Sequence, residues 1–124
     1  ATEEFIRFVS PVNNMCRVAT ADVEVGGEMI GAGQQVVLMY PSANRDTAHF
    51  TDPEAFDITR HPNQHLAFGF GEHLCLGASL ARLEARLLLE ELLARFPRVE
   101  ITGAPTWSRS TLVRGYASLP GRLG

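Results

Sequence analysis

Apolar and polar residues alternate in the first third of the chain in a pattern typical of short strands. The alternation over residues 22–30 surrounds the pair Gly26 and Gly27, which predicts a β-hairpin. A continuous apolar and β-branched run over residues 35–40 predicts a strand buried on both faces and ended by a proline. Residues 2–8 indicate the last turns of a helix. Strands therefore dominate this part of the predicted fold.

The middle of the chain is polar and rich in turn residues. Only a short helix around Thr47 is expected between residues 42 and 65. Loops of this length inside a domain are uncommon and are usually functional or disordered. Phe50, Phe56 and Ile58 are residue types that favour burial, so we expect this loop to be ordered.

Residues 76–96 carry apolar side chains at helical spacing and predict one long helix. Its exposed face is expected to hold two i,i+4 ion pairs, Arg86 with Glu90 and Glu91 with Arg95. Residues 98–101 and 112–119 predict strands after it. The pattern as a whole indicates an α+β protein.

Composition and charge exclude several classes of protein. The 124 residues are 45% hydrophobic and 20% charged, as in a soluble globular domain. The net charge of -3 gives no global attraction to nucleic acid, and no membrane span or secretory signal is recognised. With only Cys16 and Cys75, both expected to be reduced, we expect a cytoplasmic protein.

The candidate chemistry lies in a glycine-rich loop over residues 68–77, which brings Cys75 to the first turn of the long helix. A helix N-terminus stabilises a thiolate, because its free N–H groups and dipole favour negative charge. Gly69, Gly71 and Gly77 allow positive φ or close approach of the backbone to a bulky flat group. The alternative is that Cys75 is a small buried hydrophobic residue.

Phe68, Gly71, Cys75 and Gly77 form the pattern Phe-x-x-Gly-x-x-x-Cys-x-Gly. This pattern resembles the haem-thiolate signature of the cytochromes P450, and chance would produce it at roughly a few per million sites. The resemblance extends from residue 4 to about residue 120. Segments 42–46 and 65–69 are similar to the soluble, bacterial branch of that family, and segment 10–17 is similar to its actinobacterial members.

The resemblance implies that the chain is the C-terminal haem-thiolate portion of a cytochrome P450 fold, which is mainly α when intact, because intact members are about three times as long. It divides residues 1–124 into successive parts of one domain. These are the end of a Glu-x-x-Arg helix (1–9), a β-rich segment (10–41), a meander (42–66), the cysteine-ligand loop (67–77), the long helix (76–96) and C-terminal strands (98–120).

Residue roles follow from the resemblance position by position. Cys75 matches the proximal axial ligand of the iron in haem b, and Phe68 matches the residue packed beside its sulfur. His73 and Arg17 match positions that reach the haem propionates, although each is an ordinary surface cation when judged without the family. The loop glycines Gly69, Gly71 and Gly77 complete the predicted cofactor-binding set.

Two further groups of residues are implied by the same resemblance. Glu4, Arg7 and Arg60 match a structural network of charges, and Glu4 with Arg7 is otherwise an ordinary i,i+3 helix pair. The predicted substrate-lining residues are Val12, Asn13, Asn14, Leu112 and Val113. No residue of the chain matches a distal catalytic residue of the family.

The implied function is that of a monooxygenase which, when intact, activates O2 at a cysteine-ligated haem iron to hydroxylate an apolar small molecule, such as a sterol or fatty acid. The implied electron donor is a ferredoxin-type protein. Arg82, Arg86 and His61 are expected to form its local basic docking patch, or else a merely solvated face. The isolated fragment is expected to be inactive.

Two alternatives stay open from the sequence alone. The first is a non-catalytic, truncated haem-binding or scaffolding fragment, which can self-associate through exposed apolar surface. The second is a zinc site formed by Cys75, His73, His65 and His61, although the His-x-Cys spacing suits tetrahedral zinc poorly.

Overall fold

Three α-helices and four two-stranded antiparallel sheets follow one another in the computed structural model, which describes residues 1–124. The helices are α1 (Thr2–Val9), α2 (Tyr40–Ala43) and α3 (Ala78–Arg95), with a short 3-10 helix at Gly71–His73. The strands are β1 (Asn14–Val18), β2 (Val23–Val25), β3 (Glu28–Ile30), β4 (Gln35–Met39), β5 (Val99–Ile101), β6 (Thr106–Trp107), β7 (Tyr116–Ser118) and β8 (Gly121–Leu123).

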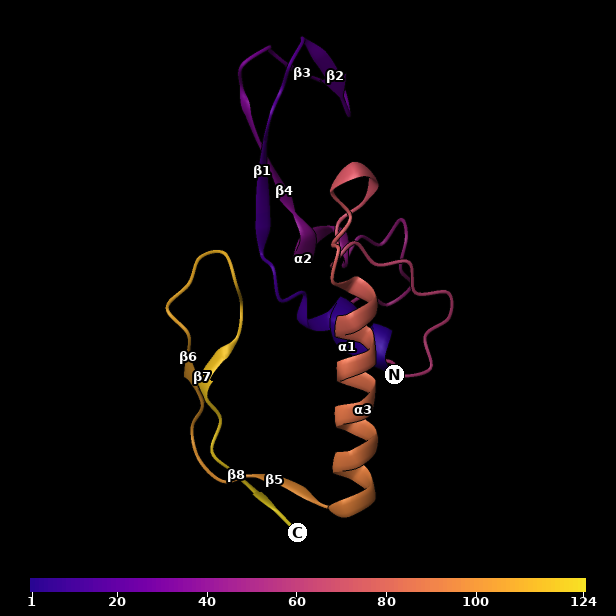
Figure 1. Ribbon diagram of the computed structural model, residues 1–124. Helices are drawn as coiled ribbons and strands as arrows, with labels where there is room; N and C mark the ends of the chain where they lie inside the picture. The colour runs from indigo at the N-terminus through magenta and orange to yellow at the C-terminus, as the bar shows by residue number, and fades with distance from the viewer.

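Strands β1 to β4 form one long projecting arm (Figure 1). β1 pairs with β4 from Asn14 opposite Met39 to Val18 opposite Gln35, and β2 pairs with β3 at the tip. The hairpin between β2 and β3 turns at Gly26 and Gly27, which both have positive φ. The hairpin expected at residues 22–30 is therefore confirmed.

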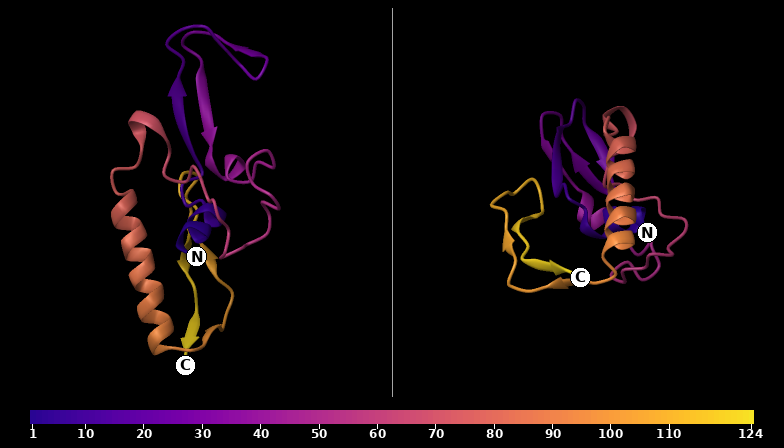
Figure 2. Two further views of the ribbon diagram at one scale, coloured as in Figure 1. Left: turned by 90° about the vertical axis from the view of Figure 1, so that its right-hand side faces the viewer. Right: turned by 60° about the horizontal axis from the view of Figure 1, so that its bottom comes forward.

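The C-terminal strands form a ribbon that continues from the end of α3 (Figure 2). β5 pairs with β8, and β6 pairs with β7 across a bulge. The loop of this ribbon returns to the segment after α1, where Val113 forms an antiparallel bridge with Val12. The two ends of the chain are thus joined by backbone pairing.

Helix α1 lies against both α3 and α2 and is the centre of the buried region. Acidic residues occupy its first turn and Arg7 its last, as the helix dipole favours. Ser10 ends the helix in the left-handed conformation, and its hydroxyl donates to the Arg7 carbonyl at 2.7 Å. No helix in the structure has the length and apolar character needed to cross a membrane.

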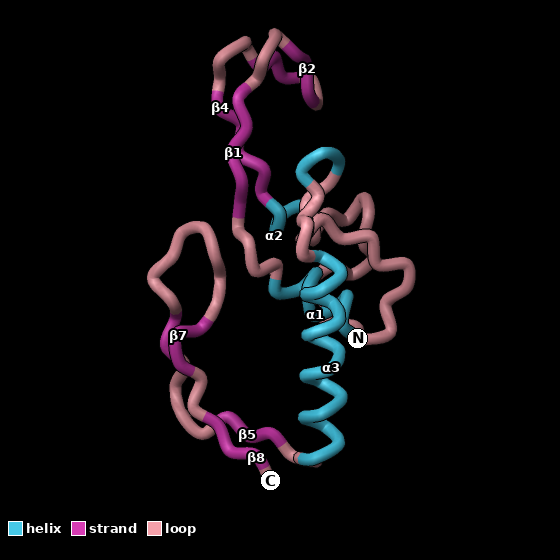
Figure 3. The backbone as a smooth tube through the Cα atoms, viewed as in Figure 1, coloured by secondary structure: helices cyan, strands magenta, loops and turns pink.

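A long loop connects α2 to α3 and carries few regular elements (Figure 3). Phe50 in this loop is buried, whereas Phe56 and Ile58 are exposed. The ring of Phe56 nevertheless contacts Phe5 and Phe8 of α1, with centroids 4.9 and 5.4 Å apart. Aromatic contacts and buried polar groups therefore order this loop more than an apolar core does.

The long helix agrees with the prediction within two residues at each end, and both expected i,i+4 pairs are present. Arg95 Nη2 lies 2.7 Å from Glu91, and Arg86 Nε lies 3.7 Å from Glu90. Because the helix begins at Ala78, Cys75 precedes its first turn instead of lying in it.

Three expectations about local structure were wrong. No helix forms at Thr47; the short helix begins earlier, because a proline in a first helical turn sacrifices no hydrogen bond. The strand expected at residues 35–40 forms over Gln35–Met39 but pairs only with β1 and stays largely exposed. The strand expected at 112–119 shrinks to β7, because residues 112–114 turn back toward α1.

Candidate haem-binding site

A tight loop presents Cys75 at the surface just before α3. The Cys75 amide donates to the Phe68 carbonyl at 2.9 Å, which closes the loop, and the Gly69 amide donates to the Leu66 carbonyl at 2.8 Å. Both free thiols of the chain are exposed, so Cys75 is not the small buried residue of the alternative interpretation. The loop therefore fixes the backbone of Cys75 while leaving its sulfur accessible.

Two glycines allow the backbone conformation of the loop. Gly69 and Gly71 have φ of 73° and 70°, in the left-handed region that side chains disfavour. A Cβ at Gly69 would also lie 3.4 Å from the His73 carbonyl oxygen. Gly77 has a negative φ, and a Cβ there would lie 3.9 Å from the Cys75 sulfur.

The Cys75 thiol opens on a cavity of about 550 Å³, within the range of ~300–1,000 Å³ that small-molecule sites occupy. Its wall is mostly apolar. The residues that line it are Ile6, Pro11, Val12, Met15, Arg17, Tyr40, Ala67, Phe68, Gly69, His73, Cys75 and Ala81. Strand β1, the cysteine loop, α1 and α3 thus meet around one space.

Five of the predicted cofactor residues line this cavity: Cys75, Phe68, Gly69, His73 and Arg17. Gly71 and Gly77 shape the loop without lining it. Nothing in the sequence assigned Ile6, Pro11, Tyr40, Ala67 and Ala81 to the site, because a single apolar or aromatic side chain carries no sign of the cavity it faces.

The donor set fits a haem. Cys75 offers a soft thiolate ligand of the kind that iron accepts, and the apolar wall suits a flat porphyrin. Arg17 and His73 line the same cavity, and neither has a carboxylate partner within the protein. Their side chains are therefore available for the carboxylates of a ligand.

Behind the cavity lies a buried network of charges around Glu4. Arg7 is completely buried and donates from Nε and Nη2 to the two Glu4 oxygens at 2.8 and 2.7 Å. Its remaining donors reach the carbonyls of Asn44, Pro53 and Ala55 at 2.7, 2.9 and 3.2 Å. All five guanidinium donors are used, so α1 is fastened to the long loop.

Arg60, in the long loop, forms an ion pair with the same Glu4 carboxylate. Its Nε lies 3.3 Å from Glu4, and its other nitrogens donate to the Thr51 and Asp52 carbonyls at 2.7 and 3.1 Å. Burial alone raises the pKa of Glu4, but the hydrogen bonds from Arg7, from the Asp57 amide and from Arg60 outweigh it and lower the pKa to about 2.

Ser10 and Asn44 extend this network and were not singled out from the sequence. Asn44 Nδ2 donates to the Ser10 hydroxyl at 2.9 Å, and Asn44 Oδ1 accepts from the Leu66 amide at 2.7 Å. Both residues are fully buried. For Asn44 the only signal was the resemblance of segment 42–46, which assigns no role to a single residue.

The predicted substrate-lining residues come from two distant segments that the structure brings together. The Asn13 amide donates to the Leu112 carbonyl at 2.8 Å, and Asn13 Nδ2 donates to the Thr111 carbonyl at 3.1 Å. Of the five predicted residues, Val12 alone lines the cavity; Asn13, Asn14, Leu112 and Val113 do not.

The remaining predicted sites are not assembled. No three His, Cys, Asp or Glu side chains converge in a way that could hold a metal ion, so the zinc alternative has no support. Arg82 and Arg86 both have carboxylate partners, Glu3 and Glu90, and do not form a patch of free cations with His61.

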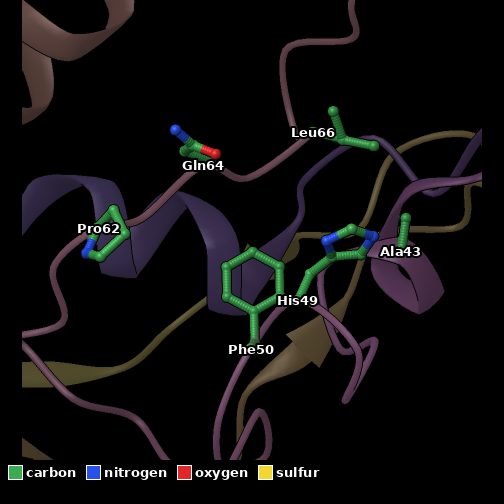
Figure 4. A pocket seen from close by; sticks show the side chains of 6 residues that line it. All are labelled: Ala43, His49, Phe50, Pro62, Gln64 and Leu66. Carbon is green, nitrogen blue, oxygen red and sulfur yellow. The ribbon is translucent and has the colours of Figure 1, made fainter.

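A second cavity, of about 250 Å³, lies along the long loop (Figure 4). The Phe50 ring stands between Pro62 on one side and His49 and Ala43 on the other, with Gln64 and Leu66 above it. None of the predicted haem-contacting residues lines this cavity. It holds no cluster of charged side chains.

Comparisons with known proteins identify the family of the chain. The family model for cytochrome P450 matches residues 1–112. The steroid C26-monooxygenase of Mycobacterium tuberculosis is 52% identical over 123 residues, which are 97% of this chain and 33% of that protein. Cytochrome P450-terp of a Pseudomonas species is 46% identical over 121 residues, which are 98% of this chain and 28% of that protein.

A solved structure gives the same result for the fold. P450BioI, in complex with acyl carrier protein ligated to hexadec-9Z-enoic acid, superposes with a TM-score of 0.95 at 43% identity. The match covers 98% of this chain and 32% of that one. The chain therefore belongs to the cytochrome P450 family, whose members bind haem b, and spans about a third of the length of these relatives.

Proposed function

We propose that this chain holds the proximal face of haem b in a cytochrome P450 monooxygenase. The observation that carries the proposal is the convergence of Cys75, His73 and Arg17 on one apolar cavity in a chain of this family. Haem bound there would supply the activation of O2 that inserts one oxygen atom into a C–H bond, with electrons from a redox partner. The non-catalytic alternative is not favoured, because a close relative carries the name of a monooxygenase.

The chain's own contribution is to place and protect the ligand. Cys75 would bind the iron through its sulfur, and the hydrogen bond of its amide to the Phe68 carbonyl keeps the loop in one conformation. The Phe68 ring would exclude water from the sulfur. Arg17 and His73 would orient the ring by donating to its propionates, since charge-assisted hydrogen bonds are strong and directional.

We assign an apolar small molecule as the substrate class, with a sterol or a fatty acyl chain as the narrower choice. One relative is named as a steroid monooxygenase, and P450BioI was solved with a fatty acyl group on its carrier protein. The paired segments around Val12 and Val113 would form part of the substrate pocket.

The partner and the compartment follow from the same proposal. A ferredoxin-type protein would supply electrons, and the two unpaired cysteines suit the reducing cytoplasm. Leu80, Leu83 and Leu87 of α3 are exposed in this chain, so an isolated copy is expected to self-associate through such apolar surface.

A chimera tests the proposal. The chain replaces the matching third of the Mycobacterium tuberculosis steroid C26-monooxygenase, to which it is 52% identical. We expect steroid hydroxylation in the chimera, its loss in the Cys75→Ser variant, and its retention in the Cys16→Ser control. A chimera that binds haem and works equally well with Cys75→Ser would overturn the proposed role of Cys75.

A further inference from the structure

We propose that Glu3 is a positioning residue for the cysteine loop, because it holds Arg82 and His65 against Phe68. The inference deepens the proposed function and depends on the role of Cys75 given there. It differs from the Glu4 network, since it joins α1 to α3 and to the loop by separate contacts.

The first contact is a two-pronged ion pair between helices. Arg82 of α3 donates from Nε to Glu3 Oε1 at 2.8 Å and from Nη2 to Glu3 Oε2 at 3.1 Å. Two parallel hydrogen bonds fix the plane of the guanidinium as well as its position. Because these donors bind Glu3, they are not free to bind a partner protein.

The second contact fixes His65 from both sides of its ring. His65 Nδ1 accepts a hydrogen bond from the Ala67 amide at 3.2 Å, so Nε2 carries the hydrogen and donates to Glu3 Oε2 at 3.1 Å. The His65 side chain is 1% exposed. A neutral imidazole therefore links Glu3 to the backbone directly before Phe68.

Both groups meet at the Phe68 ring. The Arg82 guanidinium carbon lies 4.6 Å from the ring centroid, within the range of a cation–π contact. The His65 ring centroid lies 5.8 Å from that of Phe68. The Phe68 carbonyl accepts a hydrogen bond from the Cys75 amide. A shift of Phe68 would therefore also shift the backbone of Cys75.

The ion pair between Glu3 and Arg82 would not by itself fix the position of the cysteine loop. Glu3 and Arg82 are about 40% exposed, and exposed ion pairs stabilise proteins by only ~0–1 kcal/mol. The expected consequence of losing Glu3 is therefore local: Ala67 and Cys75 become less protected, while distant elements keep their stability.

Amide hydrogen exchange of the full chain, measured by NMR without haem, tests the inference. In Glu3→Ala we expect exchange at Ala67 and Cys75 to accelerate by about tenfold, as the loss of a charge-assisted hydrogen bond implies. Glu3→Gln, which keeps the shape, should accelerate it less. The amides of β1 and β4 serve as the internal reference, and Glu91→Gln, which weakens an exposed pair on α3, is the matched control.

Arg82→Lys separates geometry from charge, because lysine keeps the positive charge and lacks the planar fork. We expect it to accelerate exchange at Cys75 as Glu3→Ala does. Unchanged exchange at Ala67 and Cys75 in Glu3→Ala, an equal acceleration of all amides, or wild-type exchange in Arg82→Lys would overturn the inference. The test contains no haem, so its outcome is independent of whether Cys75 proves to be the iron ligand.

Discussion

Arg7 Nη1 donates a hydrogen bond to the carbonyl of Asn44, 37 residues later, at 2.7 Å. The two residues are fully buried, and the side-chain oxygen of Asn44 accepts a hydrogen bond from the Leu66 amide. Polar contacts therefore connect α1 to the beginning and the end of the long loop that leads to the cysteine.

Removing Arg7 should unfold this region. Arg7→Ala removes the two hydrogen bonds that Arg7 donates to the buried Glu4 carboxylate and its hydrogen bonds to three carbonyls. The loss of one partner of a buried ion pair costs about 3–5 kcal/mol. Urea denaturation followed by circular dichroism measures the change. Arg95→Ala, which breaks an exposed pair, should cost at most ~1 kcal/mol. Equal effects of the two variants would contradict the role of the network.

Acid should destabilise the chain in a defined pH window. The pKa of Glu4 is lowered from 4.5 to about 2, so the unfolded chain binds the proton first as the pH falls. The stability that ionised Glu4 contributes is thus present above pH 4.5 and is lost between there and pH 2. We expect Glu4→Gln to be less stable at pH 7 and to show a flatter profile of unfolding free energy below pH 4.5.

Protonation of His65 should also destabilise the chain, at a higher pH than protonation of Glu4. Burial lowers the pKa of His65 below 6.5, and the Glu3 carboxylate opposes this only in part. Arg82, the other charged group facing it, also lowers this pKa. The stability that neutral His65 contributes is therefore fully present above pH 6.5, and it is lost as the pH falls from there through the lowered pKa. His65→Gln should flatten this part of the profile, and an unchanged slope would contradict it.

The two loop glycines should respond differently to alanine. Gly69→Ala and Gly71→Ala both force a side chain to positive φ, at about 1 kcal/mol each. Only at Gly69 would the new Cβ touch another group, the His73 carbonyl oxygen at 3.4 Å, whereas Gly71 faces open space. Thermal unfolding should show the larger loss for Gly69→Ala. A larger loss for Gly71→Ala would contradict the contact between residue 69 and the His73 carbonyl.

The proposed propionate contacts predict a loss of haem affinity. Arg17→Gln and His73→Gln should each weaken haem binding by about tenfold or more, because each removes a charge-assisted hydrogen bond. Titration of the chain with haem, followed by absorbance, measures the affinity. Arg95→Gln, at the far end of α3, should bind haem as the unmodified chain does. Unchanged affinity in both test variants would remove these residues from the site.

Much of the site could be predicted from the sequence, because it depends on residues with strict local requirements. The hairpin at Gly26 and Gly27, the long helix and the loop around Cys75 each follow from turn chemistry, periodicity or a fixed motif. Family resemblance located Glu4 and Arg60 at positions that the structure places in contact.

Other features depended on the three-dimensional arrangement. The helix at Tyr40–Ala43 was missed because proline ends a strand and begins a helix equally well. The exposure of β4 was missed because an apolar run predicts burial only if something covers it. The contact of Arg82 with Glu3 joins residues 79 positions apart, for which no local pattern exists.

The reduced, carbon monoxide-treated absorption spectrum of the haem-loaded chain tests the central claim most directly, beside the Cys75→Ser and Cys16→Ser variants. Both cysteines are free and exposed, so they differ in position and not in accessibility. We predict a red-shifted Soret band in the unmodified chain and in Cys16→Ser, and its loss in Cys75→Ser. A band that survives in Cys75→Ser would show that Cys75 does not bind the iron.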